Sequence, residues 1–374
     1  MTTSTLSEDD LYRTSTQYRL WSFSPEQLDA QRKKTHELAL ARARQYQQNA
    51  AISQDDLLTQ KEELGLVNRY CTVTTLMAER LKFPNNVTAT AVQYLKRFYL
   101  SNSCMTYPPK EIYKTVLFLA SKTEAIHWSV GRFASSFNGD PEAILAPEYK
   151  VMQALRFTLD VRHPYRGLKG VLMELLNMVE GIEGSTLEGK SGSEVKEGLA
   201  ALAPPKQGES RTPWRAPSSG KVSDAMVKDR IMAAYDTARH LLDSPASITD
   251  SYFLYTPSQI LLAALQVADP TLAGFYLDTK LPLELPTRPK ILGVISACAA
   301  LLASFDPKGG MTKQESVALE EKLERCRDPT TRDLVKSHMN AKSGGSSDDK
   351  KRKLEREKNS KDMDDMFGPS LSKG

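Results

Sequence analysis

The sequence predicts an all-α protein built as a tandem of two similar helical units. Almost every stretch with regularly spaced apolar residues follows the helical period, and no segment alternates apolar and polar residues convincingly as a half-buried strand would. The helical segments fall into two runs of about five, each near the size of a small domain. At 374 residues, the chain is long enough for two such domains and their cores.

The first helix is marked by its capping residues. In the text SPEQLDAQ, Ser24 suits the N-cap, Pro25 suits the first helical position, and Gln27 completes a capping box. The text YRLWSF comes just before it, and its large apolar residues exceed what a helix entrance needs. We expect some of them to dock on the body of the protein or on a partner, and the sequence leaves both possibilities open. The residues concerned are Tyr18, Leu20, Trp21 and Phe23.

The first run of helices continues with long helical text at residues 55–81. The segment NNVTATAVQYLKRFYL follows, with apolar residues at helical spacing along one face. Its other face should be wet, since it carries Gln93, Lys96 and Arg97. Acidic neighbours such as Glu62 and Glu63 are also expected on a solvated face.

The next helix contains the text VLFLASKTEA, at residues 116–125. It is apolar nearly all round, which is typical of a helix at the centre of a bundle. Lys122 and Glu124 follow one turn later, where that core meets solvent. Shorter helices at residues 130–137 and 141–158 complete the first run.

The second run begins with YRGLKGVLMELLNMVE and resumes with SDAMVKDRIMAAYDTARHLL. In YTPSQILLAAL, Thr256, Pro257 and Gln259 repeat the arrangement of cap, proline and capping box. The longest uncharged apolar run, at residues 291–305, closes this group. It is shorter than the roughly 20 residues that span a bilayer, so we expect a buried core helix and no membrane partner.

These patterns divide the chain into six parts. Low hydrophobicity and dense charge predict disorder at the C-terminus, and the Gly-rich and Pro-rich text inside the second run predicts a flexible insertion. The expected parts are a disordered N-terminus at 1–17, an aromatic segment and helix at 18–50, a first unit at 55–160, a second unit at 163–306 with the insertion at 181–222, a C-terminal helix at 312–328, and a disordered charged tail at 340–374.

Composition excludes several classes of function. The net charge is +4, and the nine basic and seven acidic residues from position 340 onward supply about half of it. The body is therefore close to neutral, which argues against direct nucleic-acid binding. The four cysteines form no CxxC pair, and no signal peptide is present, so they are expected to be core thiols of a soluble intracellular protein: Cys71, Cys104, Cys298 and Cys326.

No motif nominates a catalytic site, a metal or a cofactor. The text GSTLEGKS, at residues 184–191, fits a phosphate-binding loop by its letters, with Lys190 and Ser191 in the ligand positions. A working loop follows a buried strand, whereas the preceding text here is helical, so we interpret the match as a decoy. The five histidines show no metal-ligand spacing.

A short basic cluster lies in the C-terminal tail, in the text DDKKRKLEREK. It is either a plain solvated tail or a nuclear-localisation signal. Its basic residues are Lys350, Lys351, Arg352 and Lys353.

Several separate motifs, occurring in order, resemble the cyclin H family of transcription-associated cyclins. They are YLKRFYLSNS, LFLASKTEA, HPYRG, YFLYTPSQI and EEKLERC. The resemblance runs from about residue 18 to residue 327, interrupted by the insertion. It implies two five-helix cyclin boxes flanked by terminal helices, in a regulatory subunit without chemistry of its own. It also favours a nuclear location and the nuclear interpretation of the basic cluster.

The resemblance further implies a site and partners. In cyclins, a lysine ending the third helix and a glutamate in the fifth contact the kinase, and the matching residues here are Lys122 and Glu148. Phe118 and Glu124 are expected on the same surface, although departures from the family pattern at Thr123 and Ala125 leave the part of Glu124 open. The implied partners are a cyclin-dependent kinase, a RING-finger assembly subunit and the core of transcription factor TFIIH. The implied kinase substrates are kinase activation segments and the RNA polymerase II C-terminal domain.

Two other classes share parts of this pattern. Factors of the TFIIB type also have two cyclin boxes but bind DNA, and they carry a Cys-rich zinc ribbon and a strongly basic face. The first 70 residues here lack cysteine, and the body is near neutral. Cyclins of the Mediator-associated cyclin C type are the second class. The terminal helices and the text YTPSQI favour the cyclin H type over them.

Overall fold

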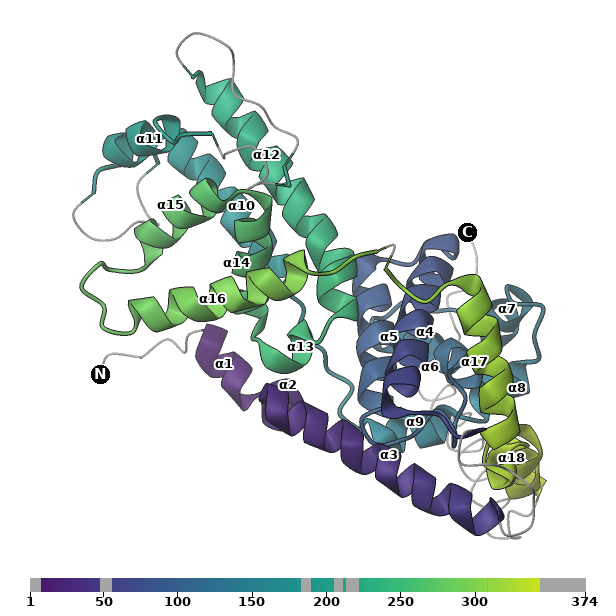
Figure 1. The fold of residues 1–374 in the computed structure, drawn as a ribbon. Coiled ribbons are helices and arrows are strands. Elements are labelled where there is room, and N and C mark those ends of the chain that lie inside the picture. Colours follow the sequence, from purple (N-terminus) through teal and green to yellow (C-terminus); the bar gives the residue numbers. More distant parts are fainter. Residues whose placement is uncertain are drawn as a thin grey trace, which may run out of the picture.

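The architecture comes from a computed structural model, which describes residues 8–47, 56–182, 190–204, 211–212, 222–307 and 309–343. Within these residues every regular element is a helix, which confirms the all-α prediction. Two groups of helices lie next to each other, and the N-terminal helices run along both of them (Figure 1). No helix in this part of the chain is both long and apolar enough to cross a membrane.

The first unit is centred on α5 and α6. The prediction for α6 is confirmed, because nearly all of its residues from Ile112 to Ser121 are buried. The wet face expected for α5 is wrong: Gln93, Lys96 and Arg97 are all buried. The helices of this unit are α4 (Gln60–Arg80), α5 (Asn85–Phe98), α6 (Pro109–Thr123), α7 (Val130–Ser135), α8 (Pro141–Leu145) and α9 (Glu148–Ala154).

The polar face of α5 is buried because it meets the second unit and the N-terminal segment instead of water. Gln93 Nε2 donates to the carbonyl of Ser247 at 3.0 Å, and Lys96 Nζ donates to the carbonyl of Ile248 at 2.9 Å. Arg97 Nη2 donates to the side-chain oxygen of Gln17 at 3.2 Å. The spacing of residues shows which face of a helix is polar. It does not show whether that face meets water or a polar group of another element.

The second unit follows a short linker at residues 160–164. The capping box predicted from Thr256 and Gln259 forms at the start of α14. The helices are α10 (Tyr165–Val179), α12 (Asp224–Leu241), a π-helical segment η2 (Leu242–Ala246), α13 (Ser251–Leu254), α14 (Pro257–Ala268), α15 (Pro270–Lys280) and α16 (Arg288–Ala303). The core helix expected at residues 291–305 forms as α16, but it is buried on one face only. One face of α16 packs on the unit, and the other exposes small residues that lose little by contacting water.

The N-terminal residues are more ordered than expected. The structure places helices α1 (Glu8–Thr14) and α2 (Thr16–Trp21) in part of the segment predicted to be disordered, and α3 (Pro25–Gln47) follows. Ser15 caps α2 by accepting a hydrogen bond from a backbone N–H. Gln17 is fully buried, and its side-chain oxygen accepts from Arg97 and from the backbone N–H of Arg162 at 2.8 Å. A polar residue that satisfies buried donors orders this segment, which hydrophobic content alone does not predict.

Part of the predicted flexible insertion is also helical. Helix α11 (Gly192–Ala200) begins at Ser191, which forms a capping box with Glu194, and it buries Val195 and Leu199. The hydroxyl of Ser191 therefore caps a helix, and the element preceding this text is α10, as the decoy interpretation requires. Residues 184–189 of the motif lie outside the described part of the chain.

The C-terminal helices return to the first unit (Figure 1). Helix α17 (Lys313–Cys326) packs against α4, a 3-10 turn η3 (Pro329–Thr331) follows, and α18 (Leu334–Ser343) lies against α8. Helix α18 thus extends slightly into the segment that was predicted to be disordered from residue 340. Arg327 forms a bidentate pair with Glu111, with N–O distances of 2.6 and 2.9 Å, and anchors the chain after α17.

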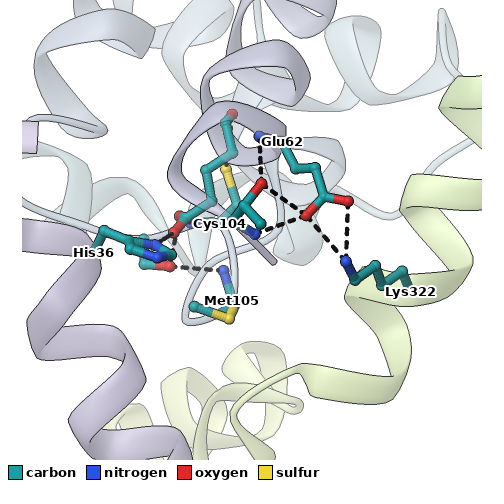
Figure 2. A network of polar contacts seen from close by, with 8 residues as sticks. His36, Glu62, Cys104, Met105 and Lys322 are labelled. Carbon is teal, nitrogen blue, oxygen red and sulfur yellow. Dashed lines mark hydrogen bonds and ion pairs between the residues drawn. The ribbon is translucent and has the colours of Figure 1, made fainter. Parts of the chain in front are cut away.

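Glu62 and Glu63, at the start of α4, connect the flanking helices α17 and α3 to the first unit (Figure 2). Glu62 pairs with Lys322 of α17 at 2.9 Å. The carboxylate of Glu63 pairs with His36 of α3 at 2.6 Å and accepts from the backbone N–H of Cys104 at 2.8 Å. The prediction of a solvated face is therefore wrong for Glu63, which is buried because it has partners on several elements.

Candidate functional site

Two charged side chains meet on the surface of the first unit. Lys122 lies in the last turn of α6, and Glu148 is the first residue of α9. Lys122 Nζ and Glu148 Oε1 form an ion pair. The lysine side chain is 41% exposed and the glutamate side chain 17%, so the pair lies at the border between core and solvent.

Helix ends bring this pair together and favour its charges. A cation is favoured near the C-terminus of a helix and an anion near the N-terminus, where each meets the opposite end of the helix dipole. Lys122 and Glu148 occupy these two positions. The ring of Phe118, one turn earlier on α6, lies 4.9 Å from the lysine nitrogen and gives it a cation–π contact. The site therefore presents a positioned charge pair on a rigid base.

Two exposed aromatic residues follow Glu148 in the chain: Tyr149 is the second residue of α9, and Phe157 lies in the turn after that helix. Tyr149 is 59% exposed and Phe157 is 60% exposed, and their ring centroids are 6.3 Å apart. Both Arg156 and Phe157 have positive φ, near 55°, which is uncommon for residues other than glycine. Sequence reasoning missed this pair, because exposure depends on the turn after α9 and not on the residue type.

The structure separates the predicted site residues into three kinds. Lys122 and Glu148 face solvent together. Phe118 is almost fully buried and packs against Phe133 at 5.2 Å, so it supports the surface from beneath. Glu124 is partly buried, and its Oε1 accepts a hydrogen bond from Thr90 at 2.7 Å.

The aromatic segment before α3 docks on the body of the protein, which answers the question its sequence left open. Trp21 is buried, and its indole N–H donates to the hydroxyl of Thr158 at 3.0 Å. Phe23 packs edge-on against Phe253 of the second unit at 5.9 Å. Leu20 is partly buried in the same cluster. Trp21 and Leu20 belong to helix α2 itself, so this segment does not simply precede the first helix.

Other candidates do not form a chemical site among the described residues. All four cysteines are free and buried, as predicted for core thiols, and burial raises the pKa of the Cys71 thiol to about 12. No group of three or more His, Cys, Asp or Glu that could hold a metal is present in the described ranges. The basic cluster at residues 350–353 lies outside them.

Comparison with known proteins places both units. The family model for the N-terminal domain of cyclins matches residues 40–160, and the model for the cyclin C-terminal domain matches residues 163–303. These two domains are the two helical units of the structure, and we call them the first and the second box.

Individual relatives agree with this result. The chain is 32% identical to cyclin CCL1 of Saccharomyces cerevisiae over 290 residues, 74% of this chain and 63% of CCL1. It is 26% identical to cyclin-H1-1 of Arabidopsis thaliana over 288 residues, 71% of this chain and 73% of that protein. It is similar to a chain in the structure of the CAK complex from Chaetomium thermophilum bound to ATP-gamma-S, with 34% identity and a TM-score of 0.72, covering 91% and 96% of the two chains. The chain therefore belongs to the cyclin family and is of the cyclin H type.

Proposed function

We propose that the chain is the regulatory subunit of a cyclin-dependent kinase, which it binds and activates without chemistry of its own. The observation that carries the proposal is the surface formed by the Lys122–Glu148 ion pair together with exposed Tyr149 and Phe157. An exposed aromatic pair is typical of an interface core, because aromatic residues are enriched there, and a charge pair is typical of the polar rim. The likeness to a chain of a CAK complex supports a kinase as the partner.

The proposed mechanism is a conformational one. Kinase catalysis needs the pairing of its strand lysine with a glutamate on its αC helix, and it needs the metal-binding aspartate in place. The cyclin surface packs against αC and holds it inward, so that this pair assembles. Lys122 and Glu148 fix the register of the contact, and Tyr149 and Phe157 supply the apolar area that is buried on binding.

We further propose the wider setting of the complex. Its partners are a RING-finger assembly subunit and the TFIIH core, and its location is the nucleus, reached with the help of the basic cluster at residues 350–353. The kinase phosphorylates activation segments of other kinases and the RNA polymerase II C-terminal domain. These proposals rest on the resemblance to the cyclin H family.

Purification of the tagged chain from its own cells tests the proposal. The bound proteins are identified by mass spectrometry, and the recovered kinase is assayed with and without added cyclin on a kinase activation-segment peptide. We expect a cyclin-dependent kinase to co-purify and its activity to depend on the cyclin. Recovery without any kinase, or a kinase equally active alone, would contradict the proposal.

A surface variant with a matched control makes the test specific. Changing both Tyr149 and Phe157 to serine should abolish co-purification of the kinase. The control is Met173→Ser on α10 in the second box, where a methionine side chain is 52% exposed. The control should bind the kinase like the wild type, because its exposed apolar residue lies on the other box. Equal binding by both variants would place the interface elsewhere.

A further inference from the structure

A chain of four hydrogen-bonded side chains runs from the second box to the end of α6. The hydroxyl oxygen of Tyr252, on α13, lies 3.0 Å from Nδ1 of His163. Nε2 of His163, in the linker between the boxes, lies 2.8 Å from the hydroxyl oxygen of Thr90 on α5. The hydroxyl of Thr90 in turn lies 2.7 Å from Oε1 of Glu124. The chain therefore connects the second box with the residue that caps α6.

Counting protons gives this chain a single direction. An ionised carboxylate only accepts, so the one proton of the Thr90 hydroxyl is donated to Glu124. The hydroxyl oxygen of Thr90 must then accept from His163, which places the imidazole proton on Nε2. Nδ1 is left without a proton and accepts a hydrogen bond from the Tyr252 hydroxyl. Every donor points toward Glu124, and its carboxylate is the terminal acceptor.

The surroundings keep the histidine neutral, as this arrangement requires. His163 is partly buried, and burial together with the nearby Arg97 charge lowers its pKa to about 3. Thr90 and Tyr252 are fully buried, so no kinase surface can reach either of them. Hydrogen bonds in a low-dielectric interior are strong and costly to leave unmade. The middle of the chain at Thr90 and its far end at Tyr252 are thus closed to solvent.

Glu124 holds the end of the helix that carries the proposed interface lysine. It is the C-cap residue of α6, two positions after Lys122, and its backbone N–H bonds to the carbonyl of Ala120 at 3.0 Å. The next residue, Ala125, has a φ of 57° and turns the chain away from the helix. Fixing the Glu124 side chain therefore fixes the last turn of α6 and the direction from which Lys122 leaves it.

We propose that Glu124 is a positioning residue that acts through Lys122, and that the second box holds it in place through His163 and Thr90. The inference rests on the proposed kinase-binding function and assigns Glu124 a part in it other than direct contact. It also assigns the second box a part in kinase binding at a distance from the interface.

The experiment measures the affinity of the co-purified kinase for full-length cyclin variants, and the activity at saturating cyclin. Glu124→Ala and Thr90→Val should each weaken affinity about tenfold, because each removes one end of a part-buried charged hydrogen bond. Glu124→Gln keeps an oxygen that accepts from Thr90, so its affinity should stay within about threefold of wild type. The double variant should be no weaker than either single variant, since both act through one contact.

Three outcomes would overturn the inference. Wild-type affinity in Thr90→Val, with equal losses in Glu124→Gln and Glu124→Ala, would make Glu124 a direct contact. A full further loss from Glu124→Ala in a Lys122→Ala background would show that it does not act through the lysine. A Lys122→Ala variant with unchanged affinity would overturn the interface itself together with this inference, whereas the first two outcomes leave the interface intact.

Two further variants separate positioning from general stability. Thr88→Val, on the same helix, removes a hydroxyl that donates to the carbonyl of Pro84 at 3.4 Å, and it should bind the kinase like wild type. Tyr252→Phe deletes a single oxygen at the far end of the chain and serves if Thr90→Val does not fold. We expect Tyr252→Phe to weaken affinity about threefold, since it breaks a neutral hydrogen bond. If the Tyr252→Phe variant bound the kinase with wild-type affinity, the second box would have no role in kinase binding.

Discussion

Two lysines on neighbouring helices of the first box have opposite surroundings. Lys96 of α5 is buried, donates to backbone carbonyls of the second box, and lies 3.5 Å from the carboxylate of Asp250, which also binds Arg32 of α3. Lys122 of α6 faces solvent beside Glu148. A buried charge is costly unless it is fully paired, whereas an exposed pair contributes little to stability. The first lysine therefore belongs to the architecture, and the second is available to a partner.

The largest expected effect is at the buried site. Asp250→Ala leaves Lys96 and Arg32 without their shared carboxylate, and we expect a loss of about 3–5 kcal/mol in the free energy of unfolding. Chemical denaturation of the purified chain measures it. The matched control is Asp160→Ala, which removes an exposed carboxylate 2.8 Å from Arg162 and should cost no more than about 1 kcal/mol. Equal losses in the two variants would erase the distinction between buried and exposed pairs.

The docked aromatic segment should have the next largest effect. Trp21→Ala removes a buried ring that bonds to Thr158 and packs in a cluster with Leu28, Leu100 and Phe253, at a cost of about 3 kcal/mol. Tyr18→Ala is the control, since its ring is 40% exposed and its loss should cost about 1 kcal/mol or less. Thermal unfolding of both variants checks the difference. A Trp21→Ala variant as stable as Tyr18→Ala would mean that the segment is not docked.

Acid should weaken the buried site. Burial would raise the pKa of Asp250, but Lys96 and Arg32 outweigh burial and lower it from 3.8 to about 2. The stability from this ionised carboxylate is therefore present above about pH 4 and is lost as the pH falls toward 2, which amounts to about 2 kcal/mol. The difference in unfolding free energy between wild type and Asp250→Asn should shrink over that range. A difference that stays constant from pH 6 to pH 2.5 would contradict this account.

The smallest effect on stability is expected at the surface pair. Lys122→Ala should change the free energy of unfolding by no more than about 1 kcal/mol, because both helix ends remain packed and the lysine side chain is 41% exposed. Circular dichroism during thermal unfolding checks this. A loss above 3 kcal/mol would show that Lys122 is a structural residue like Lys96.

The sequence predicted the elements whose signals are local. The capping boxes at Ser24 and Thr256 come from side chains within one turn of the backbone they bind, and both form as expected. The Lys122–Glu148 pair was found through the family resemblance, and its two members meet in space. Helix α11 was missed although Ser191 and Glu194 spell a capping box, because the glycine-rich text around them favoured a loop.

The errors have a common physical cause, which is long-range polar pairing. Lys96 and Glu63 look like solvent-facing charges until the partners from other elements are known, and these partners are 27 or more positions away in the sequence. The hydrogen-bond chain that ends at Glu124 likewise spans both boxes and the linker. The sequence does not show which aromatic side chains stay exposed, and Tyr149 and Phe157 were missed for that reason.

The affinity of the kinase for Lys122→Ala tests the central claim most directly. The control is Lys110→Ala at the other end of α6, about 18 Å away along the helix axis. We expect Lys122→Ala to fold normally and to bind the kinase with about 2–5 kcal/mol less free energy, at least thirtyfold more weakly, with Lys110→Ala unchanged. Unchanged affinity and unchanged kinase activity in a folded Lys122→Ala variant would contradict the account.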